Sequence, residues 1–205
     1  FNLDGRLYGK VDETHIPKID IELLSQDAEF KYDDLPNKMQ NINLDLKILN
    51  STGLIDDTAI DINRLDFRIG EDQFRSSLHV NNITKNMKVD IVADGVINLT
   101  NLSQTYPLDS SLNLNGILNM DLETHFDMNS IDNQQYQNVK SSGNLKLTDF
   151  KYASEDLANP FLISNANVTF NQATAKLSNF IMKTGETDVQ ASGQLNNLVG
   201  YVFSD

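Results

Sequence analysis

Most of this chain alternates between apolar and polar residues with a period of two, and this pattern restricts its fold more than any other feature. The segment 42–48, for example, reads Ile-Asn-Leu-Asp-Leu-Lys-Ile. Successive side chains of a β-strand point to opposite faces, so such a segment has one apolar and one polar face. Similar segments recur from Leu3 to Leu195. We therefore expect an all-β protein, built on a mainly antiparallel sheet with one dry and one wet face.

Several short sequences occur twice, in the same order, in the two halves of the chain. The recurring sequences are Phe-Lys-Tyr at 30–32 and 150–152, Gly-Glu at 70–71 and 185–186, and Glu-Thr-His at 13–15 and 123–125. Self-similarity at a long period indicates repeated units that stack to bury a shared apolar face. We predict a first β-unit over 1–84, a connecting strand segment over 85–109 and a second β-unit over 110–205.

The alternation slips at one point in each half of the chain. The apolar phase jumps three positions from Ile62 to Leu65, and again from Leu177 to Phe180. A one-residue slip would turn every later side chain to the wrong face, so each jump must absorb an extra residue as a β-bulge. Bulges bend strands, and bends at matching places predict one strongly curved sheet, either a groove or a half-barrel.

Glycines mark the expected turns and one expected bend. Gly70 and Gly185 lie in polar tetrads that are typical of hairpin turns. In the connecting segment, residues 89–99 have the pattern of a strand that bends or bulges at Gly95. We expect this strand passage to end at Tyr106-Pro107, because proline lacks a backbone N–H group for the sheet.

Helical patterns are scarce in this sequence. The best candidate is the segment 130–139, with Ser130 as the N-cap and Asp132 in the first turn. We expect at most one short helix, which would decorate the sheet.

The composition excludes several classes of function. The net charge is −13, which makes nucleic acid an unsuitable partner and disfavours adhesion to anionic lipid headgroups. The chain has no cysteine, so it has neither disulfides nor thiolate chemistry. No stretch approaches the roughly 20 apolar residues of a membrane-spanning helix. The chain starts at Phe1 inside an alternating segment and has no signal peptide. We expect it to be a piece of a longer protein whose anchor lies elsewhere.

The polar residues form no recognisable catalytic or metal-binding motif. The three histidines, His15, His79 and His125, lack the spacing of metal ligands. His15 and His125 follow Glu-Thr in the two halves, so we expect them at the same strand end with a structural or surface role. The acidic pairs at 33–34 and 56–57 are typical of solvated turns. We predict no catalytic residue, no metal, no cofactor and no enzymatic activity.

The apolar face is the remaining candidate site, and it has two interpretations. In the first it is the packed core of a β-sandwich, in a secreted or surface module that binds glycan or protein. In the second it lines an open groove for the acyl chains of phospholipids. The curved, repeated, single-faced strand plan and the scarcity of helices to cover it favour the groove. The candidate lipid-facing residues are Leu44, Leu46, Ile48, Ile60, Ile62, Phe67, Leu78, Val168, Phe170, Leu177, Phe180, Met182 and Val189.

The end of the chain resembles a known family. Its pattern is Ala173-x-Ala175-x-Leu177-x-x-Phe180-x-x-Lys183-x-Gly185-x-x-x-Val189-x-Ala191-Ser192-Gly193-x-Leu195-x-x-Leu198, and Asp94-Gly95-Val96-Ile97-Asn98-Leu99 precedes it. These residues resemble the C-terminal region of the AsmA-like family of Gram-negative envelope proteins. The abundance of asparagine and the Phe-Lys-Tyr sequences suggest a Bacteroidetes-type member.

The resemblance implies a periplasmic segment of an inner-membrane-anchored protein. Such a segment is expected to be a repeating β-groove, similar to TamB and to the eukaryotic bridge-like lipid transfer proteins. The implied function is phospholipid transfer between the inner and outer membranes and outer-membrane homeostasis. The implied partners are phospholipid acyl chains and further copies of the same β-unit in the parent chain; envelope protein partners are unknown. The family defines no catalytic or binding motif to carry over to this sequence.

Overall fold

The computed structural model describes residues 1–108, 114–154, 157–172 and 174–196. These residues form one sheet of eleven strands, in which each strand pairs with the strands next to it in the sequence. Every pair is antiparallel. The strands are β1 Asn2–Tyr8, β2 Lys18–Phe30, β3 Met39–Asn50, β4 Ala59–Ile69, β5 Asp72–Asn81, β6 Lys88–Asn98, β7 Asn115–Asp127, β8 Lys140–Tyr152, β9 Phe161–Asn171, β10 Thr174–Thr184 and β11 Thr187–Asn196.

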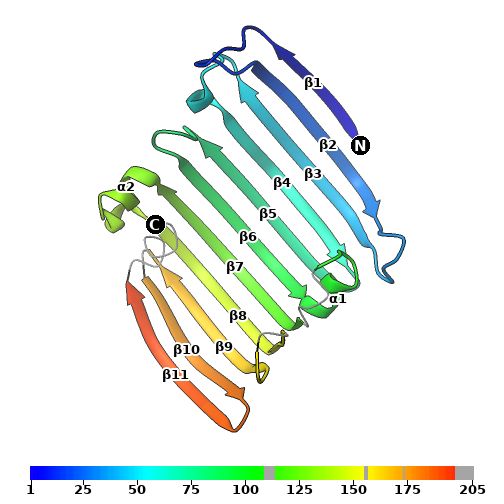
Figure 1. Ribbon diagram of the computed structural model, residues 1–205, viewed down its shortest axis with the longest axis vertical. Helices are drawn as coiled ribbons and strands as arrows, with labels where there is room; N and C mark the ends of the chain where they lie inside the picture. The colour runs from blue at the N-terminus through cyan, green and yellow to red at the C-terminus, as the bar shows by residue number, and fades with distance from the viewer. Residues whose placement is uncertain (109–113, 155–156, 173, 197–205) are drawn as a thin grey trace.

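The sheet is a single open layer (Figure 1). The strands lie side by side in chain order, and β1 and β11 form its two edges. The all-β prediction and the antiparallel prediction are therefore confirmed. The described strands do not close into a barrel. They form one layer, so the second sheet that a β-sandwich needs is absent from the described residues.

The register of the sheet follows the hydrophobic pattern. Leu46 of β3 lies opposite Leu23 of β2 and Ile62 of β4. Ile62 in turn lies opposite Leu78 of β5, which lies opposite Ile91 of β6. Residues opposite each other in adjacent strands point to the same face, so these pairs build one apolar face across the sheet.

Both predicted bulges are confirmed. The pairing of β4 with β5 shifts between Ile62 and Leu65, and that of β10 with β11 shifts between Leu177 and Phe180. Each shift absorbs the extra residue that the alternation required, so the apolar side chains on either side of a bulge stay on one face. The predicted turns at Gly70 and Gly185 are also present, and both glycines have positive φ angles, of 60° and 55°.

Strand β6 runs through Gly95 without a register shift, so its pairing contains no bulge there, and the bend predicted at Gly95 stays a prediction. Gly95 has a φ of 145°, and a Cβ atom there would lie 2.3 Å from the backbone oxygen of Gln73 on β5. Gly143 in β8 is similar: its φ is 123°, and a Cβ would lie 1.9 Å from the backbone oxygen of Asp121 on β7. At both positions only glycine lets the neighbouring backbones approach this closely.

The prediction of at most one helix was wrong, because the described residues include two short α-helices. They are α1 Leu99–Ser103 and α2 Met128–Asp132, and single 3₁₀ turns occur at η1 Ile55–Asp57 and η2 Tyr136–Asn138. The helix predicted over 130–139 begins earlier and is shorter. Its N-cap is Asp127, whose carboxylate accepts a hydrogen bond from the Ser130 backbone N–H, and Gln134 beyond it has a positive φ of 56°.

The expected end of the connecting strand was also wrong. Strand β6 ends at Asn98 and not at Tyr106-Pro107. The Asn98 side chain accepts hydrogen bonds from the backbone N–H groups of Thr100 and Asn101, which starts α1 directly after the strand. Two residues of the family-like pattern, Ala173 and Leu198, lie outside the described residues.

The two halves of the chain show parallel features within the one sheet. Strands β4 and β10 both have eleven residues, and each is followed by a glycine turn and a ten-residue strand. Strands β6 and β7, where the halves meet, pair along their length from Lys88–Asp127 to Asn98–Ile117. The unit boundaries at 84 and 110 stay predictions.

Candidate functional site

The candidate site is the apolar face of the sheet, to which all thirteen predicted residues belong. In the first half, Leu44, Leu46 and Ile48 of β3 lie opposite Leu65, Ile62 and Ile60 of β4. The paired strands β5 to β8 continue this face, with register shifts at Ile62/Leu65 and Asn115/Ile117. In the second half, the pairs that join the remaining predicted residues to this face are Val168–Leu177, Phe170–Ala175, Phe180–Ala191 and Met182–Val189.

Most of this face is not covered. Each of the thirteen predicted residues is only half-buried. Among the described residues the buried apolar side chains are few, and they are Ile69, Val89, Ala93, Phe126, Ile131, Val139 and Ala175. A strand side chain in a one-layer sheet is shielded by its lateral neighbours alone, which accounts for this partial burial.

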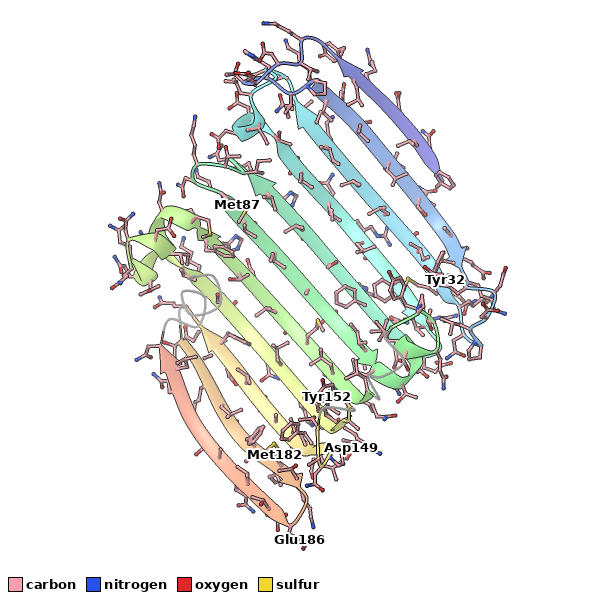
Figure 2. All side chains as sticks on the ribbon, in the orientation of Figure 1. Tyr32, Met87, Asp149, Tyr152, Met182 and Glu186 are labelled. Atoms are coloured by element: carbon pink, nitrogen blue, oxygen red, sulfur yellow. The ribbon has the colours of Figure 1, made fainter. Side chains whose placement is uncertain are left out.

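One covered area lies at the end of β5–β7 where α2 folds back. Ile131 of α2 and Val139 pack with Val89 of β6 and Phe126 of β7, and all four are buried. Val89 and Phe126 are register partners and belong to the apolar face. Helix α2 and the segment after it therefore cover this end of the apolar face. Met87 also packs against the cluster and marks this end of the sheet in Figure 2.

A second covered area lies at the opposite ends of the strands. Asn101 of α1 donates a hydrogen bond over 2.8 Å to Asp72, which lies opposite the buried Ile69. Beyond α1, the rings of Tyr106 and Tyr32 stack edge to face with centroids 5.8 Å apart. Tyr32 lies beside α1 in Figure 2. The segment 99–106 thus reaches from β6 back to the end of β2.

A third covered area lies over the first strands, where Asn50 ends β3. Its side chain is fully buried and donates hydrogen bonds to the backbone oxygen of Leu54 and to the hydroxyl of Thr58. Its carbonyl oxygen accepts one from the N–H of Gly53. Asn50 lies opposite Ile19, a residue of the apolar face. Together the three covered areas leave the middle of the apolar face as a band that runs across the strands.

This band is built mostly of apolar side chains. Its side chains are Leu, Ile, Val, Phe, Met and Ala, with Ser and Thr at a few positions such as Ser76 and Thr124. An apolar chain placed on such a face gains free energy roughly in proportion to the apolar area removed from water, about 25 cal/mol per Å².

The opposite face carries a row of cross-strand charge pairs that the sequence did not reveal. His79 Nδ1 lies 2.9 Å from a carboxylate oxygen of Asp61, and His125 Nδ1 lies 2.5 Å from one of Asp90. His125 Nε2 also lies 2.8 Å from Glu123. Hydrogen bonds from the His125 ring to these carboxylates, first Glu123 and then Asp90, raise the pKa of His125 above its ordinary value. Only the register could have identified the Asp61–His79 and Asp90–His125 pairs, because their partners lie 18 and 35 residues apart in the sequence.

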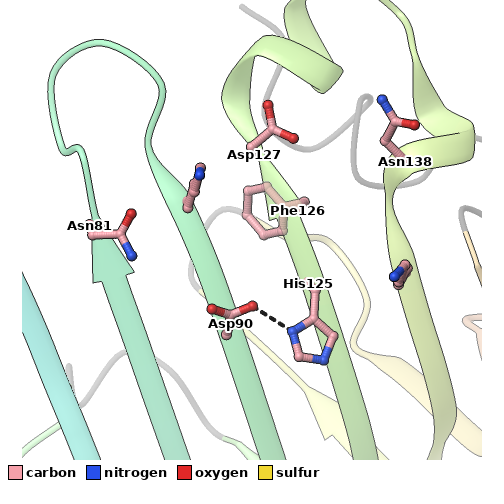
Figure 3. A pocket seen from close by; sticks show the side chains of 8 residues that line it. Asn81, Asp90, His125, Phe126, Asp127 and Asn138 are labelled. Atoms are coloured by element: carbon pink, nitrogen blue, oxygen red, sulfur yellow. Dashed lines mark hydrogen bonds and ion pairs between the residues drawn. The ribbon is translucent and has the colours of Figure 1, made fainter.

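One cavity on the described residues borders this row (Figure 3). It measures about 440 Å³ and includes Asp90, His125, Asp127, Asn81 and Asn138 in its lining. Seven of its eight lining residues are charged or polar, and Figure 3 shows the hydrogen bond between Asp90 and His125 among them. The Asp127 carboxylate is occupied as the N-cap of α2. The cavity therefore belongs to the polar face and is separate from the apolar band.

The expected equivalence of His15 and His125 was wrong. His15 lies in the loop between β1 and β2, where its ring and backbone contact the Asp12 carboxylate. His125 lies within β7. Among the described residues, no group of three or more His, Cys, Asp or Glu side chains could hold a metal ion. No helix in the described part is long and apolar enough to cross a membrane.

A comparison of the chain with known protein families, with curated proteins and with solved structures finds no match. The candidate function therefore depends on the geometry of the sheet and on the sequence pattern.

Proposed function

We propose that this chain is a non-enzymatic segment of a lipid-conducting envelope protein, which offers its apolar face to the acyl chains of phospholipids. The parent protein would be of the AsmA-like type, anchored in the inner membrane, with this segment in the periplasm. Its role would be phospholipid transfer between the inner and outer membranes. The observation that carries the proposal is the half-buried apolar band, which continues across the strands of a single-layer sheet.

The covered areas support a path across the strands. Helix α2, the 99–106 segment and the loop after Asn50 lie over strand ends, so the exposed apolar surface between them is elongated from β1 towards β11. Strands are spaced about 4.8 Å apart, so eleven strands span roughly 50 Å, which is longer than one acyl chain, since two opposed chains span the hydrocarbon core of about 30 Å in a bilayer. Several chains could occupy such a band in succession, and each would be held by apolar burial without a specific polar contact.

The proposal includes curvature of the sheet towards its apolar face. The bulges at 62–65 and 177–180 and the strand glycines Gly95 and Gly143 are devices that bend and coil sheets. A groove of this kind would shield an acyl chain from water on three sides and leave the headgroup outside. The site would then select phospholipids by their acyl chains and not by their headgroups.

The alternative, a β-sandwich module that binds glycan or protein, has less support. A sandwich needs a second sheet on the apolar face, and the described residues form one sheet. Large exposed side chains on the polar face, such as Leu24, Leu49 and Val92, are scattered and do not form an aromatic platform.

The test is photo-crosslinking with phospholipid at two positions of one strand. Leu177 lies on the apolar face of β10, and Ile181 lies on its polar face, opposite Gln190 and Asn165. A photoreactive residue at position 177 should form phospholipid adducts, detected by mass spectrometry after exposure to phospholipid vesicles. The same residue at position 181 should not. Equal labelling at both positions, or none at either, would contradict the proposal.

A further inference from the structure

Three of the four arginines in this chain line one cavity of the sheet. The arginines are Arg6, Arg64, Arg68 and Arg75, and the last three border a cavity of about 220 Å³, which we call the arginine cavity. Its described lining contains one acidic residue, Asp66, so three positive charges and one negative charge give a local charge of +2. The whole chain has a net charge of −13. A local excess of cations on an acidic protein makes this cavity a candidate site for an anion.

The arginine cavity lies on the polar face of the sheet, over β4 and β5. Phe67 of β4 and Phe74 of β5 are register partners on the apolar face, and their ring centroids are 5.1 Å apart. Arg68 follows Phe67 and Arg75 follows Phe74, so both arginines point to the opposite face. The two phenylalanines complete the lining. The cavity is therefore separate from the apolar band, and its ligand does not depend on the proposed function.

Arg68 has no acidic partner. It lies opposite Gln40 of β3 and Gln73 of β5, which are both uncharged. Its Nε atom is buried and has no hydrogen-bond partner among the described residues. Buried N–H donors are nearly always paired, and an unpaired donor of a charged group is unfavourable. Arg68 is thus a partly buried cation whose charge the neighbouring strands do not neutralise.

The acidic residues beside Arg75 also leave its guanidinium group unpaired. Asp66 lies opposite Arg75, but its carboxylate is bound by the Nε and Nη2 atoms of Arg64. Asp94 lies opposite Arg75 on the other side and is exposed to solvent. In the part of the chain that the structure describes, no ion pair joins Arg75 to either carboxylate. Arg68 and Arg75 both keep guanidinium N–H groups for a ligand.

We propose that the arginine cavity binds a phosphate group. The planar fork of an arginine donates two parallel hydrogen bonds to a phosphate or a carboxylate. A carboxylate has only two oxygens, which one or two arginines can pair. A phosphate carries more acceptor oxygens in a tetrahedral arrangement, so it can accept hydrogen bonds from arginines on several sides. Three arginines from two strands, with the amide of Gln73 beside them, therefore favour phosphate over carboxylate.

The first measurement is a calorimetric titration of the unmodified chain with inorganic phosphate at constant ionic strength. Acetate serves as the carboxylate probe. Phosphate should bind saturably at one site per chain, and acetate should bind about tenfold more weakly or less, because it offers fewer acceptor oxygens. The absence of saturable phosphate binding, or equal affinities for the two anions, would overturn the proposal. The titration involves no acyl chain, so its result is independent of the proposed lipid function.

The matched control variant uses the fourth arginine of the chain. Arg68→Gln removes a cation from the cavity, and Arg6→Gln removes the same charge from β1, where Arg6 lies opposite Asp20. Arg68→Gln should weaken phosphate binding by about tenfold or more, whereas Arg6→Gln should change it by less than about twofold. Equal losses in the two variants would show that phosphate responds to the net charge and would overturn the site.

Two further variants keep the test independent of folding. Arg68→Lys retains the charge but loses the planar fork, so its affinity for phosphate should lie between those of the unmodified chain and Arg68→Gln. Arg75→Gln changes an exposed residue and should also weaken binding by about tenfold. Urea unfolding identifies the variants that remain folded. Unchanged phosphate binding in folded Arg75→Gln would contradict the proposed cavity.

Vesicles identify the source of the phosphate group, because the same oxyanion occurs in soluble phosphate esters and in lipid headgroups. The probes are vesicles of phosphatidylcholine with and without phosphatidic acid, which exposes a phosphate monoester. A gain in vesicle binding on adding phosphatidic acid, absent in Arg68→Gln, would assign the cavity to a lipid headgroup. No gain, with binding of inorganic phosphate retained, would assign it to a soluble phosphate ester. A gain that Arg68→Gln leaves unchanged would overturn the lipid headgroup as a ligand of the arginine cavity.

Discussion

His125 of β7 and Asp90 of β6 lie directly opposite each other, and their side chains are 2.5 Å apart between Nδ1 and a carboxylate oxygen. This pair is part of a row that crosses seven strands on the polar face. The row, in register order, is Glu22, Lys47, Asp61, His79, Asp90, His125 and Lys140. Acidic and basic side chains alternate as far as His125, so each contact in that part of the row pairs an acid with a base.

The first prediction is a loss of stability as pH rises. The pKa of His125 is raised above its ordinary value of 6.5 by the hydrogen bonds that its ring donates to the Glu123 and Asp90 carboxylates. A group with a raised folded pKa contributes its full stabilisation below the unfolded pKa and loses it as pH rises through the folded pKa. The melting temperature should therefore fall from about pH 6 upwards.

The matched variants for this prediction are His125→Gln and His15→Gln. His125→Gln should flatten the fall in melting temperature, while His15→Gln, in the exposed loop after β1, should leave it unchanged. If the two variants show the same pH dependence as the unmodified chain, the protonation of His125 does not contribute to stability.

The second prediction concerns the close approach of β7 and β8. Gly143→Ala places a Cβ 1.9 Å from the backbone oxygen of Asp121 at a φ of 123°. Both the clash and the backbone strain should destabilise the protein, by about 2 kcal/mol or more in urea unfolding. Gly193→Ala is the control, since it meets no atom within 4 Å and should change stability by less than about 0.5 kcal/mol. Comparable values for the two variants would contradict the account of Gly143.

The third prediction tests the first bulge. Deleting Asn63 removes the extra residue between Ile62 and Leu65, so the rest of β4 must either change face or shift its register. The midpoint of urea unfolding should fall, with a loss of about 3 kcal/mol or more. Deleting Asp34 in the loop between β2 and β3 should be tolerated much better, because loops absorb changes in length. An unchanged midpoint on deletion of Asn63 would show that the bulge does not set the register.

The sequence predicted most strands, both bulges and the glycine turns, because each has a local signal. In a strand such as 42–48, the alternation of apolar and polar residues identifies the two faces. The bulge after Ile62 appears in the sequence as a shift in the phase of this alternation. The caps of the helices were missed for the opposite reason. Helices of five residues such as α1 and α2 have no period to detect, and they depend on one capping side chain each, Asn98 and Asp127.

The candidate site was predictable in composition but not in exposure. Alternation assigns Leu46 and Leu177 to one face, but it cannot tell whether a second layer covers that face. That depends on where α2 and the segment 99–106 fold back, which is decided by long-range contacts such as Asn101–Asp72. The His125–Asp90 pair depends likewise on the register between strands that are 35 residues apart in sequence.

The last prediction separates the two faces by their affinity for lipid. Leu177→Asp places a carboxylate on the apolar face between Val168 and Gly193, where an acyl chain would have to leave it without a hydrogen-bond partner. Ile181→Asp adds the same charge to the same strand, but on the polar face and beside Gln190 and Asn165. If the apolar band holds acyl chains, Leu177→Asp should weaken the binding of a fluorescent phospholipid by tenfold or more, because a penalty of about 1.4 kcal/mol already suffices. Ile181→Asp should bind phospholipid as the unmodified chain does.

Circular dichroism and urea unfolding of both variants establish whether the sheet persists. A loss of binding in a folded variant then reflects the face that carries the new charge and not unfolding. Equal affinities for the two folded variants would mean that phospholipid does not lie on the apolar band.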